Sequence, residues 1–265
     1  MMSRGRVVVT GASTGIGEAT ARRLADEGFD VVAVARREGR LQELSRQIGC
    51  DFFPADLTDQ DRIDDLVEFL EKGEPVSALV NVAGGAIGTD AVADGKPEDW
   101  QAMYDMNVLA TLRLTQALLP QLRDKGGDLV FLTSTAAHEA YKGGAGYTAA
   151  KHAELMIPQT LRVELVGEPV RIIEIAPGMV KTEEFSLRRL GSEEAAEQVY
   201  AGVEEPLVAE DIADIVAWTL TRPRHVNIDS VIVRPVAQAN SWTVARTEDS
   251  AAPTKLPRTA LHDIE

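Results

Sequence analysis

The chain has 265 residues, and 45% of them are hydrophobic, which is enough to bury a sizeable core. Its formal net charge of -15 argues against nucleic acid or an anionic membrane surface as a partner, because both attract basic proteins. The single cysteine, Cys50, excludes an intrachain disulfide. No apolar stretch approaches the ~20 residues that span a bilayer, so we expect a cytoplasmic protein without a membrane partner.

Short apolar segments alternate with longer segments of helical periodicity along most of the chain. The short segments are apolar almost throughout, which is typical of parallel strands covered by helices on both faces. The expected strands are residues 6–10, 31–35, 51–55, 77–82, 128–133, 171–176 and 231–234. We therefore predict an α/β fold, a Rossmann-type doubly wound seven-stranded parallel sheet with helices on both faces.

A glycine-rich turn joins the first expected strand to the first expected helix. Backbone N–H groups and the helix dipole favour a pyrophosphate there, and a Cβ at the glycines would block its approach. The turn predicts a dinucleotide site, with cofactor-binding residues Gly11, Ser13, Thr14, Gly15, Ile16 and Gly17.

No linker or repeat divides residues 1–240, which we predict to be a single NAD(P)-binding catalytic domain. Residues 241–265 are rich in Ser, Thr, Ala and Pro and lose the strand and helix patterns. This composition predicts a flexible C-terminal tail, and the alternative is a segment that folds over a partner subunit.

The same turn also matches G-x-S-x-G at Gly11, Ser13 and Gly15, the pattern of the nucleophile in α/β-hydrolases. A serine hydrolase with Ser13 as nucleophile is therefore a rival hypothesis. Its position after the first strand disfavours it, because no earlier strand supplies the second oxyanion-hole donor.

Arg36 and Arg37 follow the second expected strand, where NAD enzymes place an acidic residue on the ribose. A guanidinium can bind a 2'-phosphate that a carboxylate would repel, so we predict NADP(H) as the cofactor. Glu38 argues slightly against this assignment, and the alternative is a pair of solvated surface arginines.

Tyr147 and Lys151 are four residues apart in a segment of helical character, so both side chains project from one face. Ser134 ends the fifth expected strand, at the edge where such sheets bind ligands. A free phenol is a poor base at neutral pH, and a neighbouring ammonium stabilises the phenolate. We therefore predict that Lys151 lowers the pKa of Tyr147, that Tyr147 transfers the proton, and that Ser134 holds the substrate oxygen.

From residue 5 to 236 the sequence resembles the short-chain dehydrogenase/reductase family, whose motifs occur here in the family's order and spacing. The resemblance implies that Asn107 belongs to the catalytic set and anchors Lys151 through water. Taken alone, Asn107 would be a residue of a helix surface or kink, and Asp56 a turn residue. The resemblance also implies further cofactor contacts: Asp56 with Leu57 on the adenine side, Asn81, Ala83 and Gly84 beneath the cofactor, and Pro177, Gly178, Val180 and Thr182 over the nicotinamide.

The chain departs from the family pattern at Val82, at Met156 and at Pro158, none of which removes a catalytic group. Pro158 removes an internal hydrogen bond, so it is expected to kink and interrupt the helix that follows Tyr147. The family implies a homodimer or homotetramer, and Pro158 puts the usual helix-on-helix geometry in doubt.

Residues 225–228 and 234–238 resemble the branch of NADP-dependent 3-hydroxy acid, or serine-like, dehydrogenases, which implies a small polar hydroxy compound as substrate. Residues 179–205 are expected to form a mobile lid in which Lys181, Arg188 or Arg189 can meet a carboxylate. A solvated helical hairpin is the alternative.

A third hypothesis is a non-catalytic NADP-binding sensor or scaffold, although the chain keeps the serine, tyrosine and lysine together. The four histidines lack metal-ligand spacing, so no metal is expected. The best-supported function is hydride transfer between NADP(H) and a small-molecule carbonyl or secondary alcohol.

Overall fold

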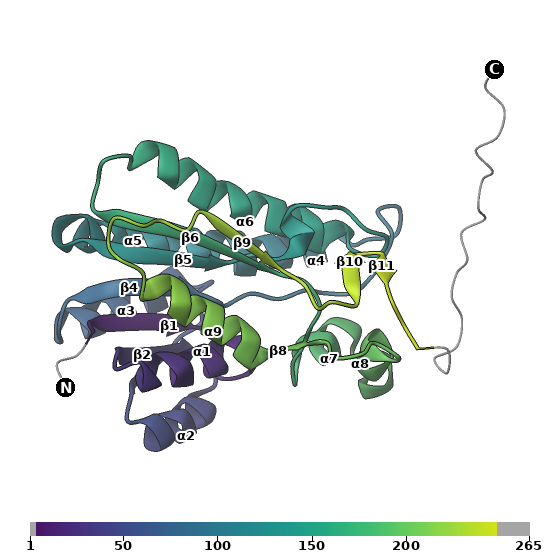
Figure 1. Ribbon diagram of the computed structural model, residues 1–265, viewed down its shortest axis with the longest axis horizontal. Helices are drawn as coiled ribbons and strands as arrows, with labels where there is room; N and C mark the ends of the chain where they lie inside the picture. The colour runs from purple at the N-terminus through teal and green to yellow at the C-terminus, as the bar shows by residue number, and fades with distance from the viewer. Residues whose placement is uncertain (1–3, 248–265) are drawn as a thin grey trace.

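The computed structural model describes residues 4–247, and a sheet of seven strands lies at its centre (Figure 1). The strand order is β3-β2-β1-β4-β5-β6-β9, and every neighbouring pair is parallel. The strands are β1 (Arg6–Thr10), β2 (Asp30–Ala35), β3 (Asp51–Pro54), β4 (Val76–Asn81), β5 (Gly127–Leu132), β6 (Val170–Pro177) and β9 (Ser230–Val233). The predicted fold class is confirmed, and the expected strands agree with the observed ones to within one residue at each end.

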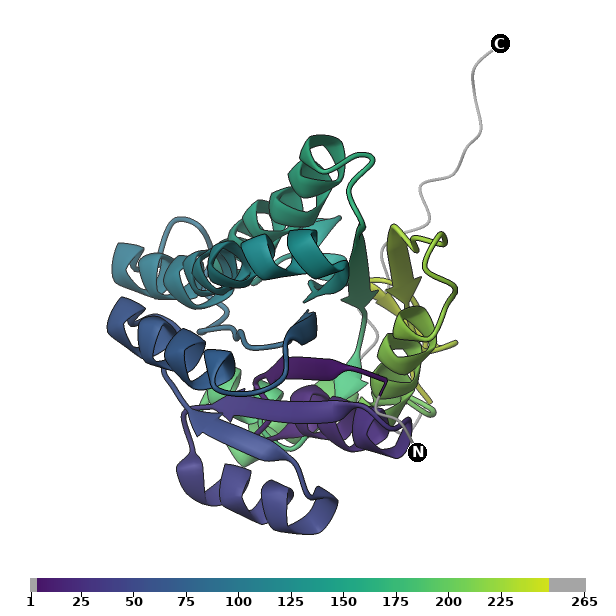
Figure 2. The same cartoon turned by 90° about the vertical axis from the view of Figure 1, so that its left-hand side faces the viewer.

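Helices cover both faces of the sheet on two separate apolar cores, and Figure 2 shows the strands fanning out between them. Val7 and Val9 of β1 face the core that contains Leu24 and Ile212, whereas Val8 faces the opposite core. Successive strand residues point to opposite faces, so nearly continuous apolar strands are what this arrangement requires. The helices that cover the sheet are α1 (Gly15–Asp26), α2 (Glu38–Ile48), α3 (Gln60–Glu71), α4 (Pro97–Tyr104), α5 (Ala110–Lys125), α6 (Ala145–Glu164) and α9 (Ala209–Leu220).

The carboxyl edge of the sheet carries the remaining elements, because parallel strands all end on the same side. A π-helix, η1 (Asp105–Leu109), joins α4 to α5, and a 3-10 turn, η2 (Thr135–Ala137), follows β5. In Figure 1, α7 (Phe185–Leu190), α8 (Glu193–Tyr200) and β10 (Gln238–Asn240) gather beside this edge. The small strands β7 (Val180–Lys181) and β8 (Leu207–Val208) form a separate parallel pair.

The predicted lid, residues 179–205, contains the short helices α7 and α8. Two ion pairs connect the beginning of this segment to the N-terminus of α2. Glu183 pairs with Arg40 at 3.2 Å, and Glu184 pairs with Arg37. The segment is therefore a structured cover on the carboxyl edge, attached to the part of the sheet that follows β2.

Helix α6 continues through Pro158, which is buried within it. The expectation that Pro158 interrupts this helix is therefore wrong. A proline in a helix removes one backbone donor, and the turns on either side of Pro158 maintain the helix.

The C-terminal part of the described chain forms a hairpin of β10 and β11 (Thr243–Val244). Ser241 donates to the Glu139 carboxylate from its backbone N–H at 2.9 Å and from its hydroxyl at 2.7 Å. The N–H of Thr247 donates to the carbonyl of Gly202 at 2.8 Å. The first residues of the predicted tail, 241–247, thus contact the domain in the structure, and residues 248–265 lie outside the described part of the chain.

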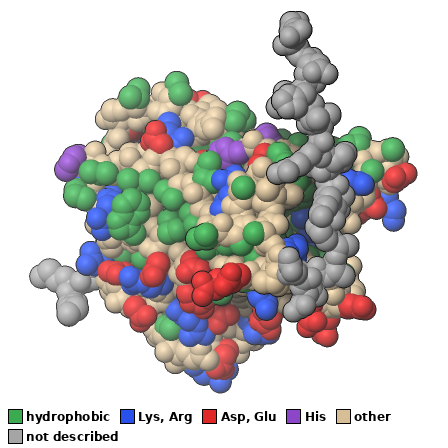
Figure 3. All heavy atoms as spheres, turned by 45° about the vertical axis from the view of Figure 1, so that its right-hand side comes forward, with side chains coloured by type: hydrophobic (Ala, Val, Ile, Leu, Met, Phe, Trp, Pro, Cys, Tyr) green, Lys and Arg blue, Asp and Glu red, His purple; other side chains and the backbone are tan. Residues whose placement is uncertain are grey.

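On the face drawn in Figure 3, acidic and basic side chains are interleaved along the lower part of the molecule. Exposed i,i+4 pairs such as Arg22 with Glu18 contribute little to stability, because water screens them. Within residues 4–247, no helix combines the length and the apolarity needed to cross a membrane.

A buried ion pair ties the far end of β6 to β5. Arg171 is 4% exposed and Asp128 is 6% exposed, and their side chains form two hydrogen bonds of 2.7 Å. Arg171 also donates to the carbonyl of Leu220 at 2.9 Å, which joins the end of α9 to the sheet. Removing the carboxylate would leave the guanidinium buried without a counter-charge.

We expect Asp128→Ala to lower the free energy of unfolding by about 3–5 kcal/mol, because Arg171 then remains charged and unpaired. The measurement is urea denaturation followed by circular dichroism. Asp124→Ala, an exposed carboxylate on the same side of the molecule, serves as the control and should change stability by about 0.5 kcal/mol or less. Equal stability of the two variants would contradict this account of the pair.

Candidate active site

One large cleft opens at the carboxyl edge of the sheet, with a volume of about 870 Å³. Its wall combines the glycine turn, the ends of β2, β5 and β6, the start of α6, and α7. Most of the residues singled out from the sequence line it: Gly11, Ser13, Thr14, Gly15, Ile16, Gly17, Arg36, Arg37, Asp56, Leu57, Ala83, Gly84, Ser134, Tyr147, Lys151, Pro177, Gly178, Val180 and Thr182. The fold therefore brings the expected cofactor residues and the expected catalytic residues into one cavity.

Asn81 and Asn107 do not line the cleft but lie behind its wall. Asn81 ends β4 at 3% exposure, and Asn107 is fully buried in the π-helix η1. The Asn107 amide accepts from the N–H of Gly85 at 3.1 Å and donates to the carbonyl of Met103 at 2.7 Å. A Cβ added to Gly84 would lie 2.6 Å from Oδ1 of Asn107 and 3.6 Å from Nζ of Lys151, so both side chains converge on this glycine.

The glycine turn has the form that a pyrophosphate requires. Gly11 and Gly15 have φ values of 67° and 53°, in the left-handed region that side chains other than glycine rarely adopt. A Cβ on Gly17 would lie 2.3 Å from the carbonyl oxygen of Gly11, so only glycine permits this packing. Helix α1 begins at Gly15, and its free N–H groups are directed at the cleft end of the turn. These residues fit a bound dinucleotide phosphate.

Arg37 connects the glycine turn to the lid. Its guanidinium donates to Oγ of Ser13 at 3.1 and 3.3 Å and to the carboxylate of Glu184. Arg36 is more exposed, and its guanidinium lies 3.9 Å from the Asp56 carboxylate. Two guanidinium groups and one hydroxyl thus surround the point where β2 ends.

Ser13 has none of the surroundings of a hydrolase nucleophile. The hydrogen bonds of its side chain are with Arg37, and the histidines with side-chain partners in the described chain bond elsewhere. His138 bonds Glu174, and His152 bonds the carbonyl of Thr148. Within residues 4–247, no histidine bonds Ser13 as a general base would.

The expected catalytic residues form one buried cluster. Ser134 follows β5, and its hydroxyl accepts from the backbone N–H of Ala136 at 3.1 Å. Tyr147 and Lys151 lie on α6 at 8% and 4% exposure, and Nζ of Lys151 is 6.0 Å from the centre of the Tyr147 ring. Lys151 also donates to the carbonyl of Leu132 at 3.1 Å, which fixes the ammonium against the end of β5.

Burial raises the pKa of Tyr147 above its ordinary value, and the charge of Lys151 and the hydrogen bond of Ser134 lower it only in part. Tyr141 and Glu154 act in the same direction as burial. The phenol expected from the sequence to be acidified is thus, in the protein alone, held in its protonated form. Burial lowers the pKa of Lys151, but the charges of Glu154 and Tyr147 outweigh burial and raise it overall.

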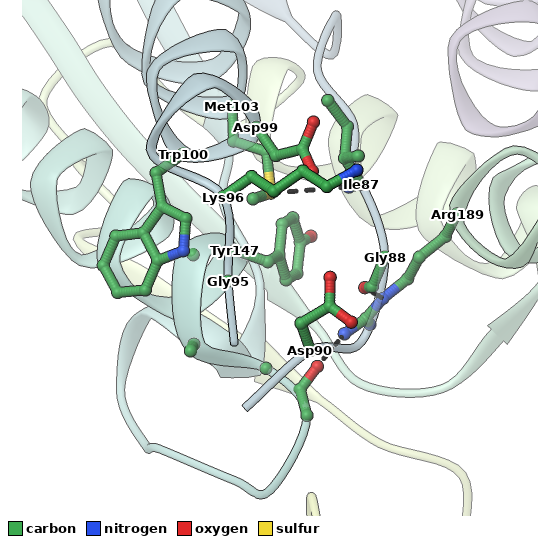
Figure 4. A pocket seen from close by; sticks show the side chains of 14 residues that line it. Ile87, Gly88, Asp90, Gly95, Lys96, Asp99, Trp100, Met103, Tyr147 and Arg189 are labelled. Carbon is green, nitrogen blue, oxygen red and sulfur yellow. Dashed lines mark hydrogen bonds between the residues drawn. The ribbon is translucent and has the colours of Figure 1, made fainter. Parts of the chain in front are cut away.

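A recess beside Tyr147 is lined by side chains of different kinds (Figure 4). Trp100 and Met103 of α4 contribute apolar surface on one side. On the other side, the guanidinium of Arg189 lies 5.6 Å from the centre of the Tyr147 ring. It donates to the carbonyl of Gly88 at 3.1 Å and to the Tyr141 hydroxyl at 3.0 Å, so this lid cation is held in place over the catalytic ring.

Sequence reasoning missed Glu154, which is 1% exposed and lies 2.6 Å from Nζ of Lys151. The i,i+3 spacing from Lys151 was a signal, because residues three apart are neighbours on a helix. It also missed Glu184, whose carboxylate faces Arg37, and no local pattern announces that contact between distant segments. Within residues 4–247, no three His, Cys, Asp or Glu side chains form a group that could hold a metal ion.

Comparison with known proteins gives this site a family. Residues 6–191 match the model of the short chain dehydrogenase family. An uncharacterized oxidoreductase of Mycobacterium tuberculosis is 54% identical over 236 residues, which cover 88% of this chain and 92% of that protein. The serine 3-dehydrogenase of Agrobacterium fabrum is 39% identical, covering 89% of this chain and 95% of the relative.

The closed form of serine dehydrogenase complexed with NADP+ superimposes with a TM-score of 0.85 at 34% identity, covering 89% of this chain and 97% of that structure. The chain therefore belongs to the short-chain dehydrogenase family. It is an oxidoreductase that acts on CH–OH groups and their carbonyl counterparts, and the predicted resemblance to serine-like dehydrogenases is confirmed.

Proposed function

We propose that the protein is an NADP-dependent reductase that interconverts the carbonyl and secondary alcohol of a small hydroxy acid, with Tyr147 as the proton-transfer group. The observation that carries this proposal is the convergence of Ser134, Tyr147 and Lys151 in a buried cluster on the same cleft as the glycine turn. The sequence similarity to a serine 3-dehydrogenase supports the choice of substrate class.

Each residue of the cluster has a separate role. The Ser134 hydroxyl, which favours the Tyr147 phenolate, holds the substrate oxygen next to the Tyr147 hydroxyl. In carbonyl reduction Tyr147 donates its proton to that oxygen, and in alcohol oxidation the phenolate accepts the proton. Lys151 stabilises the phenolate left after donation, and Asn107 supports the wall on which Lys151 rests. A bound dinucleotide would supply or accept the hydride.

The ammonium acts on the phenol at short range. Its Nζ lies 6.0 Å from the ring centre, and its charge favours the phenolate and so lowers the pKa of Tyr147. Burial acts in the opposite direction and is larger in the protein alone. A resting phenol that can still lose its proton suits the reduction of a carbonyl.

We expect Tyr147→Phe to lower kcat by about 10²- to 10⁴-fold, because no other group stands ready to protonate the substrate oxygen. The measurement is NADPH oxidation with a panel of 3-oxo acids, diketones and aldehydes. Tyr104→Phe, an exposed tyrosine of α4, is the control and should retain wild-type turnover. Near-normal turnover of Tyr147→Phe would refute the mechanism, and tight NADPH binding without any turnover by the wild type would favour a sensor.

The pH dependence follows from the raised pKa of Tyr147. Reduction needs the phenol, so its kcat/KM is retained at neutral pH and falls as pH rises through the Tyr147 pKa. Oxidation needs the phenolate, so its rate rises through the same pKa. Both limbs should appear on the alkaline side of neutrality.

The end of β2 supports a choice of NADP over NAD. Arg36, Arg37 and the Ser13 hydroxyl together offer two positive charges and several donors there. Asp56 is one nearby acid, and its carboxylate accepts from the Thr58 hydroxyl at 2.7 Å and the Thr58 N–H at 3.0 Å. A 2'-phosphate would then compete with Glu184 for the guanidinium of Arg37.

We expect Arg36→Ala and Arg37→Ala each to lower kcat/KM for NADPH about 10- to 100-fold while leaving the value for NADH nearly unchanged, since each removes charged hydrogen bonds to the phosphate. Steady-state kinetics with both cofactors measures this. Arg46→Ala, at the exposed far end of α2, is the matched control. A wild-type preference for NADH would overturn the assignment.

Arg189 supports an acidic substrate, because its guanidinium lies over the catalytic ring and is held by the neutral acceptors Gly88, Tyr141 and Gly143. Its positive charge has no carboxylate partner among the described residues. A substrate carboxylate would provide that partner in a partly buried site.

Arg189→Leu should raise KM for a 3-oxo acid at least about tenfold and leave KM for the corresponding methyl ester nearly unchanged, because only the acid loses an ion pair. Arg188→Leu, whose exposed guanidinium pairs with Glu184, provides the neighbouring control. Equal effects of Arg189→Leu on acid and ester would show that the residue only shapes the recess.

The cytoplasmic location and the homodimer or homotetramer stay predictions.

A further inference from the structure

Lys151 has a buried carboxylate as a neighbour on its own helix. The Glu154 carboxylate lies 2.6 Å from Nζ of Lys151, and the two side chains are 1% and 5% exposed. Both groups are therefore out of reach of solvent, and each is the other's nearest opposite charge. A buried pair of this kind is expensive to form, which makes a purely structural reason for its presence weak.

Two groups contact the ammonium of Lys151. The Glu154 carboxylate forms an ion pair with it, and the carbonyl of Leu132 accepts a hydrogen bond from it at 3.1 Å. Tyr147 lies on the same helix, with its ring centre 6.0 Å from Nζ. The carboxylate and the carbonyl together fix the lysine side chain in one position.

The charge environment of Tyr147 is set by groups from several elements. Lys151 and Glu154 come from α6, Tyr141 from the loop before it, and the Arg189 guanidinium from α7. Lys151 favours the phenolate and Glu154 opposes it. The carboxylate thus cancels part of the field with which the ammonium would acidify the phenol.

Glu154 itself faces two charged groups. Burial raises the pKa of Glu154 and the buried Glu174 of β6 adds to the rise, whereas Lys151, its partner on α6, favours the carboxylate. Glu174 is occupied by the hydroxyls of Thr133 and Ser230, each at 2.6 Å, and by His138 at 2.7 Å. Glu174 therefore has its own partners, and Lys151 is the cation that compensates Glu154.

We propose that Glu154 is a positioning residue that fixes Lys151 and keeps the Tyr147 hydroxyl protonated, so that the site is set for carbonyl reduction. This inference rests on the proposed function of Tyr147. Glu154 touches neither substrate nor cofactor in this role, because it acts only through the ammonium of Lys151. Its buried negative charge moves the balance between phenol and phenolate toward the phenol.

The test is the pH dependence of kcat/KM in both directions for the wild type and for Glu154→Gln. The amide keeps the shape and an acceptor for Lys151 but removes the charge. Lys151 keeps the Leu132 carbonyl and the phenolate as partners, so it stays charged when Tyr147 ionises. We expect the rising limb of oxidation and the falling limb of reduction to move together to lower pH by about one unit, a tenfold change in the phenolate fraction.

Glu164→Gln is the control, because it removes an exposed carboxylate from the far end of the same helix, α6, away from Lys151. It should leave the position of both limbs unchanged. If Glu154→Gln does not fold, Glu154→Met removes the same charge with a side chain of similar length and should move the limbs in the same direction.

Unchanged limbs in a folded Glu154 variant, with rates lowered equally in both directions, would overturn the inference and leave the pair a structural one. That failure is distinguishable from failure of the proposed function. The proposed function fails if Tyr147→Phe retains turnover, whereas the inference fails if Tyr147→Phe is inactive and the Glu154 variants keep the wild-type limbs.

Discussion

The site depends on one electrostatic constraint, which is that a phenol buried beside an ammonium must be able to exist in two protonation states. Burial favours the neutral phenol, and Lys151 one helical turn away favours the phenolate. Neither effect alone allows proton transfer. A phenol that never ionises cannot donate its proton, and one that is always ionised has no proton to donate. The surrounding residues adjust this balance, Ser134 from the end of β5 and Glu154 from the next turn of α6.

The fold makes this balance possible by bringing distant segments to one edge. Parallel strands place the glycine turn, Ser134 and Pro177 on the same side of the sheet, and α6 brings Tyr147 and Lys151 to meet them. The lid then completes the cleft, with Arg37 bridging Ser13 and Glu184 at one end and Arg189 lying over Tyr147 at the other. One short segment thus reaches both the glycine turn and the Tyr147 ring.

Much of this arrangement could be predicted from the sequence, because it follows local patterns. Apolar runs such as those of β1 and β6 revealed the strands, and the glycine spacing revealed the turn. The pair Tyr147 and Lys151 needed only the period of a helix. Asp56 and Leu57 also reached the cleft as the family resemblance implied.

What could not be predicted depends on contacts between distant residues. Whether Glu154 is buried or exposed is decided by the sheet behind α6, and spacing alone does not show it. Asn107 is buried in a π-helix, in which the backbone hydrogen bonds run from residue i to i+5 for one turn. No feature of the composition predicts this change. Residues 241–247 look polar and irregular, yet Glu139 and Gly202 hold them in place. Pro158 shows the reverse case, in which a strong local signal is overridden by packing.

The measurement that tests the central claim most directly is the titration of Tyr147 itself. The chain has four tyrosines, so carbon-13 labelling at the phenolic carbon gives few signals, and the Tyr147→Phe variant identifies the one that matters. With oxidised cofactor present, the account predicts that this signal titrates at distinctly lower pH in the wild type than in Lys151→Met. Identical titration in the two proteins would contradict it, because the ammonium would then have no influence on the phenol.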